Sequence, residues 1–238
     1  MPESRTGPSA AASPRPNLAQ RRKSATRMEI AHTAARLFAE RGTAAVTAEQ
    51  IAAASGVGLR TFYRYCRTKE DAVEPMLSAG ASRWLDILGD RPDRLPTIAE
   101  LETAAIRALT VVDRDELDIT RGLLRAMADD TALRAVWFRV NLTGEHALLE
   151  LLAKLSPDAD PLRLRTLAAA AAGAIRIGLE QWADDDSPAH SPAQVGGIDE
   201  IPSTATRSGG PAPLVVRCMR ELTAGVYAQA PADPTASG

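Results

Sequence analysis

Aromatic residues are scarce in this chain, at 4% of 238 positions, and only two cysteines occur. Cys66 and Cys218 are far apart and lack metal-ligand spacing, so we expect small packing residues and neither a disulfide nor a metal site. The most apolar stretch, 167–175, is too short to span a bilayer and is followed by Arg176. Residues 1–20 contain no apolar signal-peptide core. We therefore expect a cytoplasmic protein with no membrane partner.

The net charge of −2 conceals a marked asymmetry along the chain. Residues 1–70 carry 12 Lys and Arg against 5 Asp and Glu, whereas residues 71–238 carry 16 against 25. A basic N-terminal part on an acidic body predicts nucleic-acid binding confined to the N-terminal part.

Residues 47–71 have the pattern of a helix-turn-helix followed by the capped start of a third helix. Thr47 and Gln50 form a T-x-x-Q capping box that starts the first helix. Gly56 supplies the left-handed backbone that a tight turn between two helices requires. The second helix is predicted over 59–65, with Phe62 directed toward the core.

The outer face of that second helix carries hydrogen-bond donors. Arginine reads guanine with two bonds, and a threonine side chain can meet a thymine methyl or a phosphate. Thr68 is predicted to cap the next helix together with Asp71, and the nearby lysine adds positive charge beside free backbone N–H groups. The predicted DNA-binding residues are Thr47, Leu59, Arg60, Thr61, Tyr63, Arg64, Tyr65 and Lys69.

These residues resemble the TetR family of transcriptional regulators over roughly residues 25–75. The matching pieces are Ala34-Ala35-Arg36-Leu37-Phe38, Gly42, Thr47 with Ile51-Ala52, Gly56-Val57, Thr61-Phe62-Tyr63-Arg64-Tyr65 and Lys69-Glu70.

The resemblance implies roles for individual residues of the motif. In the family, residues matching Thr47, Tyr63, Tyr65 and Lys69 usually touch phosphates. Those matching Arg60 and Thr61 lie nearest the bases. The chain departs from the family pattern at two positions, because Gly58 replaces a frequent capping serine and Cys66 replaces a common phenylalanine.

The predicted fold is all-α, with an N-terminal three-helix helix-turn-helix headpiece joined by a long helix to an α-helical ligand-binding and dimerisation domain. The segment 21–23 is basic, and the sequence leaves open whether it binds DNA or is a solvated tail. The expected domains are a disordered tail (1–20), the DNA-binding domain (21–67), the ligand-binding and dimerisation domain (68–230) with a flexible loop (185–211), and a disordered tail (231–238). Helices are predicted at 24–41, 68–88, 97–112, 114–128, 131–155, 161–184 and 213–229.

The helices at 161–184 and 213–229 match the positions where TetR-like proteins build a four-helix dimer interface. The alanine-rich run 167–174 has little side-chain bulk, so helices can approach closely there. The alternative is that this helix is buried within its own subunit. We call the predicted helix 59–65 the recognition helix. Dimerisation would place the two recognition helices at half-sites about 34–36 Å apart.

The middle helices are predicted to line an apolar cavity for a small hydrophobic effector. Residues 118–182 are weakly similar to ligand domains of actinobacterial TetR-like regulators of the mycofactocin-regulator type, which implies a hydrophobic or acyl-type effector. The polar candidates also fit surface or inter-helix contacts. The ligand-binding candidates are Arg121, Arg125, Trp137, Phe138, Asn141 and His146.

The predicted function is a homodimeric repressor that a small-molecule effector releases from a palindromic double-stranded DNA operator. A transcriptional activator and an effector-independent regulator remain open alternatives. A helical enzyme with a DNA-binding head is a third, based on the carboxylates at 113–118 and on His146 with Glu150. Neither group has the ligand count of a metal site, and no catalytic motif occurs. We therefore expect no enzyme activity, no catalytic residue and no cofactor.

Overall fold

The computed structural model describes residues 18–90, 94–110, 114–185 and 210–228, and these contain helices and no β-strand. This confirms the all-α prediction. Most of the predicted tails (1–20 and 231–238) and of the predicted loop (185–211) lies outside the described residues. The helices are α1 (Leu18–Arg41), α2 (Ala48–Ala54), α3 (Leu59–Tyr65), α4 (Glu74–Gly89), α5 (Ile98–Thr110), α6 (Arg114–Ala126), α7 (Thr131–Leu155), α8 (Pro161–Asp184) and α9 (Ala212–Ala228), with 3-10 turns η1 (Thr43–Ala45) and η2 (Glu70–Val73).

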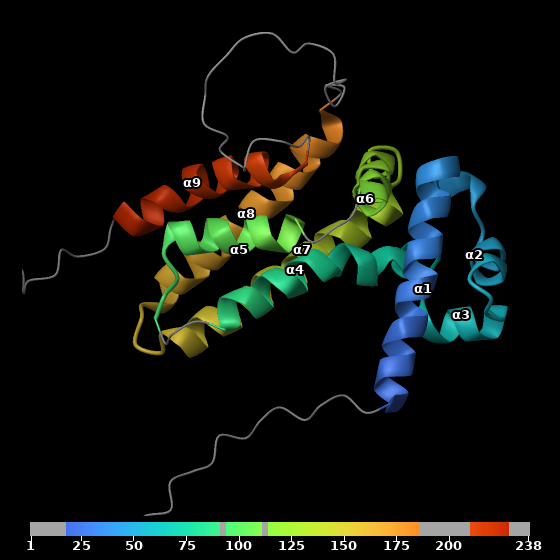
Figure 1. Cartoon of the computed structure of the whole chain (residues 1–238), viewed down its shortest axis with the longest axis horizontal. Helices are drawn as coiled ribbons and strands as arrows, with labels where there is room; N and C mark the ends of the chain where they lie inside the picture. Colours follow the sequence, from blue (N-terminus) through green and yellow to red (C-terminus); the bar gives the residue numbers. More distant parts are fainter. Residues whose placement is uncertain (1–17, 91–93, 111–113, 186–209, 229–238) are drawn as a thin grey trace, which may run out of the picture.

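Helices α1, α2 and α3 form a headpiece at one end of the molecule (Figure 1). One face of α1 is apolar and buried, including Ile30 and Phe38. Ile51 of α2 and Phe62 of α3 are fully buried in the same core. Apolar side chains at helical spacing have therefore folded the two short helices onto the long one.

Helix α1 is longer than predicted, because it begins at Leu18 and not at Ser24. Residues 18–23 are Leu, Ala, Gln, Arg, Arg and Lys, all good helix formers, so nothing local stops the helix. Its end is as predicted. Gly42 has φ +74° and its N–H donates to the Phe38 carbonyl at 2.9 Å.

The predicted helix over 68–88 is wrong in its first turn, which is the 3-10 turn η2, and α4 starts only at Glu74. Proline provides the physical reason. Pro75 lacks an N–H and is accommodated only in the first turn of an α-helix. The predicted capping pair is present, because the backbone N–H groups of Thr68 and Asp71 each donate to the other's side chain at 3.1 Å.

Helices α4, α5, α7, α8 and α9 enclose a second core, which forms the body of the molecule. Helices α7 and α8 have the predicted bounds, and each begins at an aspartate cap, Asp130 and Asp160. Helices α5, α6 and α9 differ from the predicted bounds by one or two residues at their ends. Helices α8 and α9 lie side by side (Figure 1), and Gly178 allows the close approach to Val215.

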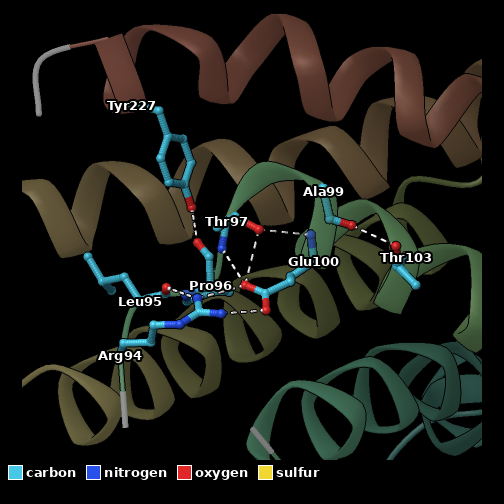
Figure 2. A network of polar contacts seen from close by, with 8 residues as sticks. All are labelled: Arg94, Leu95, Pro96, Thr97, Ala99, Glu100, Thr103 and Tyr227. Atoms are coloured by element: carbon cyan, nitrogen blue, oxygen red, sulfur yellow. Dashed lines mark hydrogen bonds and ion pairs between the residues drawn. The ribbon is translucent and has the colours of Figure 1, made fainter. Parts of the chain in front are cut away.

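A polar network fastens the start of α5 to the end of α9 (Figure 2). Arg94 donates to both carboxylate oxygens of Glu100, at 2.9 and 2.8 Å. The Thr97 N–H also donates to Glu100, at 2.8 Å, which completes a helix cap. The Tyr227 hydroxyl donates to the Pro96 carbonyl. Residues 94–97, which lead into α5, are therefore held on two sides.

Both cysteines are free, and Cys66, which directly follows α3, is buried. None of the described helices is long and apolar enough to cross a membrane.

Candidate nucleic-acid interface and effector cavity

The turn between α2 and α3 is built by short-range interactions. The Gln50 N–H donates to the Thr47 hydroxyl oxygen at 3.3 Å, and the Thr47 N–H donates to the Gln50 side chain at 3.0 Å. Gly56 has φ +68°, and the next N–H, of Val57, donates back to the Ala52 carbonyl at 2.9 Å. The predicted capping box and turn glycine are therefore confirmed, and they set the angle between the helices.

Helix α3 presents a polar outer face opposite the buried Phe62. Leu59, Arg60, Tyr63 and Arg64 are exposed, whereas the predicted contacts Thr61 and Tyr65 are half-buried. The Tyr63 and Phe62 rings pack at nearly right angles, with 5.4 Å between their centroids. Such a face offers two guanidinium groups and a phenol to a DNA groove.

The predicted phosphate contact Lys69 makes bonds within the headpiece. Its ammonium donates to the carbonyls of Thr43 at 2.6 Å and Val46 at 2.9 Å. The Glu70 carboxylate also forms an ion pair with this ammonium, with 3.8 Å between Lys69 Nζ and Glu70 Oε1. Lys69 thus ties the chain after α3 to the segment before α2, and its contact with DNA stays a prediction.

The other predicted flanking contact, Thr47, is exposed at the start of α2. The Glu49 backbone N–H and the Thr47 hydroxyl lower the pKa of the Glu49 carboxyl. This side chain is therefore ionised beside Thr47, and a phosphate there would meet both a donor and a negative charge. Contact of Thr47 with DNA likewise stays a prediction.

The first turns of α1 lie beside the end of α3. Arg22 and Lys23 line a groove together with Arg64 and Tyr65. The Arg64 guanidinium lies over the Tyr65 ring, 5.1 Å from its centroid. The basic segment 21–23 is thus part of a helix whose charges stand next to the recognition helix.

Helix α7 holds the headpiece at two points that the sequence did not reveal. The Arg139 guanidinium donates to Asp71 at 2.5 Å and to Glu74 at 3.1 Å. Asp130 caps α7; although burial opposes ionisation, bonds from the Thr43 hydroxyl and the first N–H groups of α7 lower the pKa of Asp130.

A cavity lies between α4, α5, α7 and α8, with about 70 Å³ open to water-sized molecules; we call it the body cavity. Of the six predicted ligand-binding residues, Trp137 and Asn141 line it. The other lining residues are Leu77, Gly80, Ala81, Trp84 and Leu85 of α4, Ala105, Ala108 and Leu109 of α5, Val140 and Gly144 of α7, and Ala172, Ile175 and Leu179 of α8.

Four of the predicted ligand-binding residues lie elsewhere. Phe138 is 50% exposed and faces the Arg176 guanidinium at 5.8 Å, and His146 is exposed on α7. Arg125 donates from Nε to the Ala183 carbonyl at 2.6 Å, and Arg121 donates to the Asp185 carbonyl. The last carbonyls of a helix lack partners within the helix and attract cations, so these two arginines close the end of α8.

The residues that leave space for the cavity are small, and none of them is among the predicted ligand-binding residues. Gly80 and Ala81, with Ala105, Ala108 and Gly144, face the cavity from three helices. The available signal was the recurrence of small residues among larger apolar ones on these helices. In the described part of the chain, no three His, Cys, Asp or Glu side chains are grouped so as to hold a metal ion.

The headpiece is similar to a known protein family. Residues 30–74 match the family model for "Bacterial regulatory proteins, tetR family". No curated protein matches the chain.

Solved structures resemble the chain over most of its length. A TetR-family regulator candidate from Syntrophomonas wolfei str. Goettingen aligns with a TM-score of 0.55 at 14% identity, over 89% of this chain and 100% of that chain, and supports the fold. A tetR-family transcriptional regulator from Streptomyces coelicolor gives 0.47 at 20% identity, over 85% and 82%. NalD, the secondary repressor of the MexAB-OprM multidrug efflux pump in Pseudomonas aeruginosa, gives 0.48 at 19% identity, over 87% and 96%.

Proposed function

Since residues 30–74 belong to the tetR family of bacterial regulatory proteins, we propose that this chain is a homodimeric repressor of a palindromic DNA operator. A small apolar effector that enters the body cavity releases it. The observation that carries the proposal is the outer face of α3, where Arg60, Tyr63 and Arg64 are exposed opposite a fully buried Phe62.

In this proposal α3 enters the major groove of DNA. Arg60 and Thr61 meet base edges, and Tyr63, Tyr65, Thr47 and Lys69 meet phosphates. The basic N-terminal part supports this orientation, because phosphate contacts supply most of the sequence-independent affinity.

The proposed dimer forms through α8 and α9. Ala169, Gly173 and Ile177 recur at four-residue intervals on α8, away from its buried face, and Ile177 is 39% exposed. Leu222 of α9 is 42% exposed. An apolar stripe of small residues on a long helix supports close packing against a second copy. Two-fold pairing then presents two recognition helices to two half-sites.

The proposed release works through α7. This helix lines the body cavity with Trp137 and Asn141, and it holds the headpiece through Asp130 and Arg139. A ligand that fills the cavity pushes on α7 and changes how the headpiece is held. The spacing of the two recognition helices then no longer fits the operator.

The test of DNA binding is footprinting on the DNA upstream of the gene, or on DNA selected from random sequence, across a salt series. The parent protein should protect an inverted repeat, with affinity that falls steeply as salt rises. Arg60→Ala and Tyr63→Ala should each lose about tenfold or more in affinity. Arg107→Ala, on the exposed side of α5 and outside both α3 and the proposed interface, is the matched control and should bind like the parent. Equal DNA affinity of the parent, the two α3 variants and the control would show that α3 is not the contact surface.

The dimer is tested separately by light scattering. Ile177→Asp places a charge on the proposed interface and should produce a folded monomer that binds the inverted repeat weakly. A parent protein that is monomeric at the concentrations where it protects DNA would contradict the two-fold arrangement.

A further inference from the structure

The first turns of α1 form a basic surface that no acidic residue interrupts. Arg21, Arg22 and Lys23 are all exposed, and the first acidic residue of α1 is Glu29. In Figure 1 this end of α1 extends past α3. Neighbouring cations repel one another and attract anions, so this surface favours an anionic partner.

The same turns of α1 and the end of α3 enclose a groove, which we call the α1–α3 groove. Arg22 and Lys23 line it from α1, and Arg64 and Tyr65 line it from α3. No Asp or Glu is among the described residues that line it. The groove therefore brings together three positive charges from two helices, with no carboxylate in its lining to neutralise them.

Arg64 is held at this groove by its neighbour on α3. Its guanidinium lies over the Tyr65 ring, 5.1 Å from the centroid, and the ring attracts the cation. Arg60, one turn earlier on α3, is also exposed, but it is not among the described residues that line the groove. The two arginines of the recognition helix therefore lie in different surroundings.

We propose that Arg22, Lys23 and Arg64 form one phosphate-binding site that holds the DNA backbone without reading sequence, and that Arg60 is the α3 arginine that reads bases. A helix in the major groove has a sugar-phosphate strand on either side, so cations beside the helix meet phosphates. The α1–α3 groove lies beside the end of α3 and thus faces such a strand. This inference rests on the proposed function in taking operator DNA as the ligand of α3.

Two duplexes of equal length separate backbone binding from base reading. One contains the inverted repeat found by footprinting, and the other has the same base composition in scrambled order. Fluorescence anisotropy measures the affinity for each duplex between about 50 and 200 mM salt. Each lost phosphate contact lowers the slope of log K against log salt by about 0.9 in magnitude, so a variant's deficit in affinity shrinks about 3.5-fold over that range.

Four variants assign the contacts. Arg22→Ala combined with Lys23→Ala should weaken binding to both duplexes by the same factor and lower the slope by about one to two. Arg64→Ala should also weaken both equally, with a slope change of about one. Arg60→Ala should lose more affinity for the operator than for the scrambled duplex, since a base contact needs the matching base. Arg107→Ala, on the exposed side of α5, is the control and should leave both affinities unchanged. Circular dichroism verifies the fold of each variant.

Three outcomes would overturn the inference while the parent still protects an inverted repeat. If the double α1 variant has the salt slope of the control, α1 does not contribute to the site. If Arg64→Ala loses more affinity for the operator than for the scrambled duplex, Arg64 reads bases. If Arg60→Ala loses affinity for both duplexes equally, Arg60 does not read them. A parent protein that binds neither duplex would instead contradict the proposed function, and the inference with it.

Discussion

The Arg139 guanidinium on α7 donates to the Asp71 carboxylate in η2 at 2.5 Å, across 68 positions of sequence. Asp71 also accepts from the N–H of Thr68, which lies three residues after the end of the recognition helix α3. One ion pair therefore joins the helix that lines the body cavity to the cap that ends the DNA-binding unit. About half of the Arg139 side chain is exposed, so the ion pair contributes little to the free energy of unfolding. Its main effect is to fix the position of η2 relative to α7.

Arg139→Ala should loosen the connection between α7 and the headpiece. We expect a loss of about 1 kcal/mol or less in the free energy of unfolding, because the pair is partly solvated. Amide hydrogen exchange of residues 68–74 should become faster, since η2 loses its partner on α7. Mass spectrometry of exchanged peptides measures this directly.

Arg217→Ala is the matched control for that experiment, because it removes an exposed arginine with a glutamate partner on α9. It should leave exchange of residues 68–74 unchanged. If Arg139→Ala also exchanges like the parent there, the ion pair does not restrain η2.

Gly178→Ala should destabilise the contact between α8 and α9. A Cβ at Gly178 would lie 2.7 Å from backbone atoms of Val215, so the two helices would have to separate. We expect a loss of about 1–3 kcal/mol, as for other overpacked interiors. Gly173→Ala, on the same helix, has no atom of its own subunit within 4 Å of its added Cβ, and in the monomeric Ile177→Asp background it should gain up to about 1 kcal/mol from helix propensity. Urea denaturation of both variants in that background compares their stabilities, and shifts of the same sign would contradict the close crossing.

The parts of the fold that the sequence predicted are those made by neighbours in the chain. The capping box of Thr47 and Gln50 and the positive φ of Gly56 depend on residues within one helical turn, and both are present. The bounds of α3, α7 and α8 were predicted for the same reason. The start of α4 was not, because the constraint that Pro75 places on the first turn was overlooked.

The cavity and its polar surroundings could not be predicted in the same way. Arg121 and Arg125 were candidates because they are polar residues on a helix beside apolar ones, but their acceptors are carbonyls near the end of α8, about 60 positions away. The space in the body arises where small side chains of four helices meet. Which side chains of different helices come together depends on tertiary packing, and the periodicity of residues along one helix does not define that packing.

Arg220→Ala should destabilise the body, because it leaves the Glu102 carboxylate without its ion-pair partner. Arg220 donates to both oxygens of Glu102 at 2.7 and 2.9 Å, joining α9 to α5. The Glu102 residue is only 8% exposed, so its carboxylate would lose two charge-assisted bonds where water replaces them poorly. We expect a lower midpoint of urea denaturation, with a loss limited by the exposure of Arg220 itself.

A second substitution tests whether the unpaired charge causes that loss. Adding Glu102→Gln to Arg220→Ala removes the charge and should recover part of the stability. Arg217→Ala, in a fully surface pair, should change stability by less than about 0.5 kcal/mol. A double variant less stable than Arg220→Ala would assign the effect to lost packing.

Glu100 should make the stability of the chain depend on pH in the acid range. The bonds from Arg94, and next the Thr97 N–H, hold the pKa of the Glu100 carboxyl well below its usual 4.5 (Figure 2). The folded protein therefore keeps this group ionised where the unfolded chain protonates it. Its contribution is present in full above pH 4.5 and is lost as the pH falls below that value.

Glu100→Gln should accordingly be less stable than the parent near neutral pH, and the difference should shrink as the pH falls below about 4. Urea denaturation over a pH series measures the two curves. Glu221→Gln, in an exposed pair on α9, is the control and should follow the parent throughout. Parallel curves for Glu100→Gln and the parent would mean that the arginine and the helix cap do not favour the ionised carboxylate, because only a folded state that binds fewer protons than the unfolded chain produces the predicted convergence.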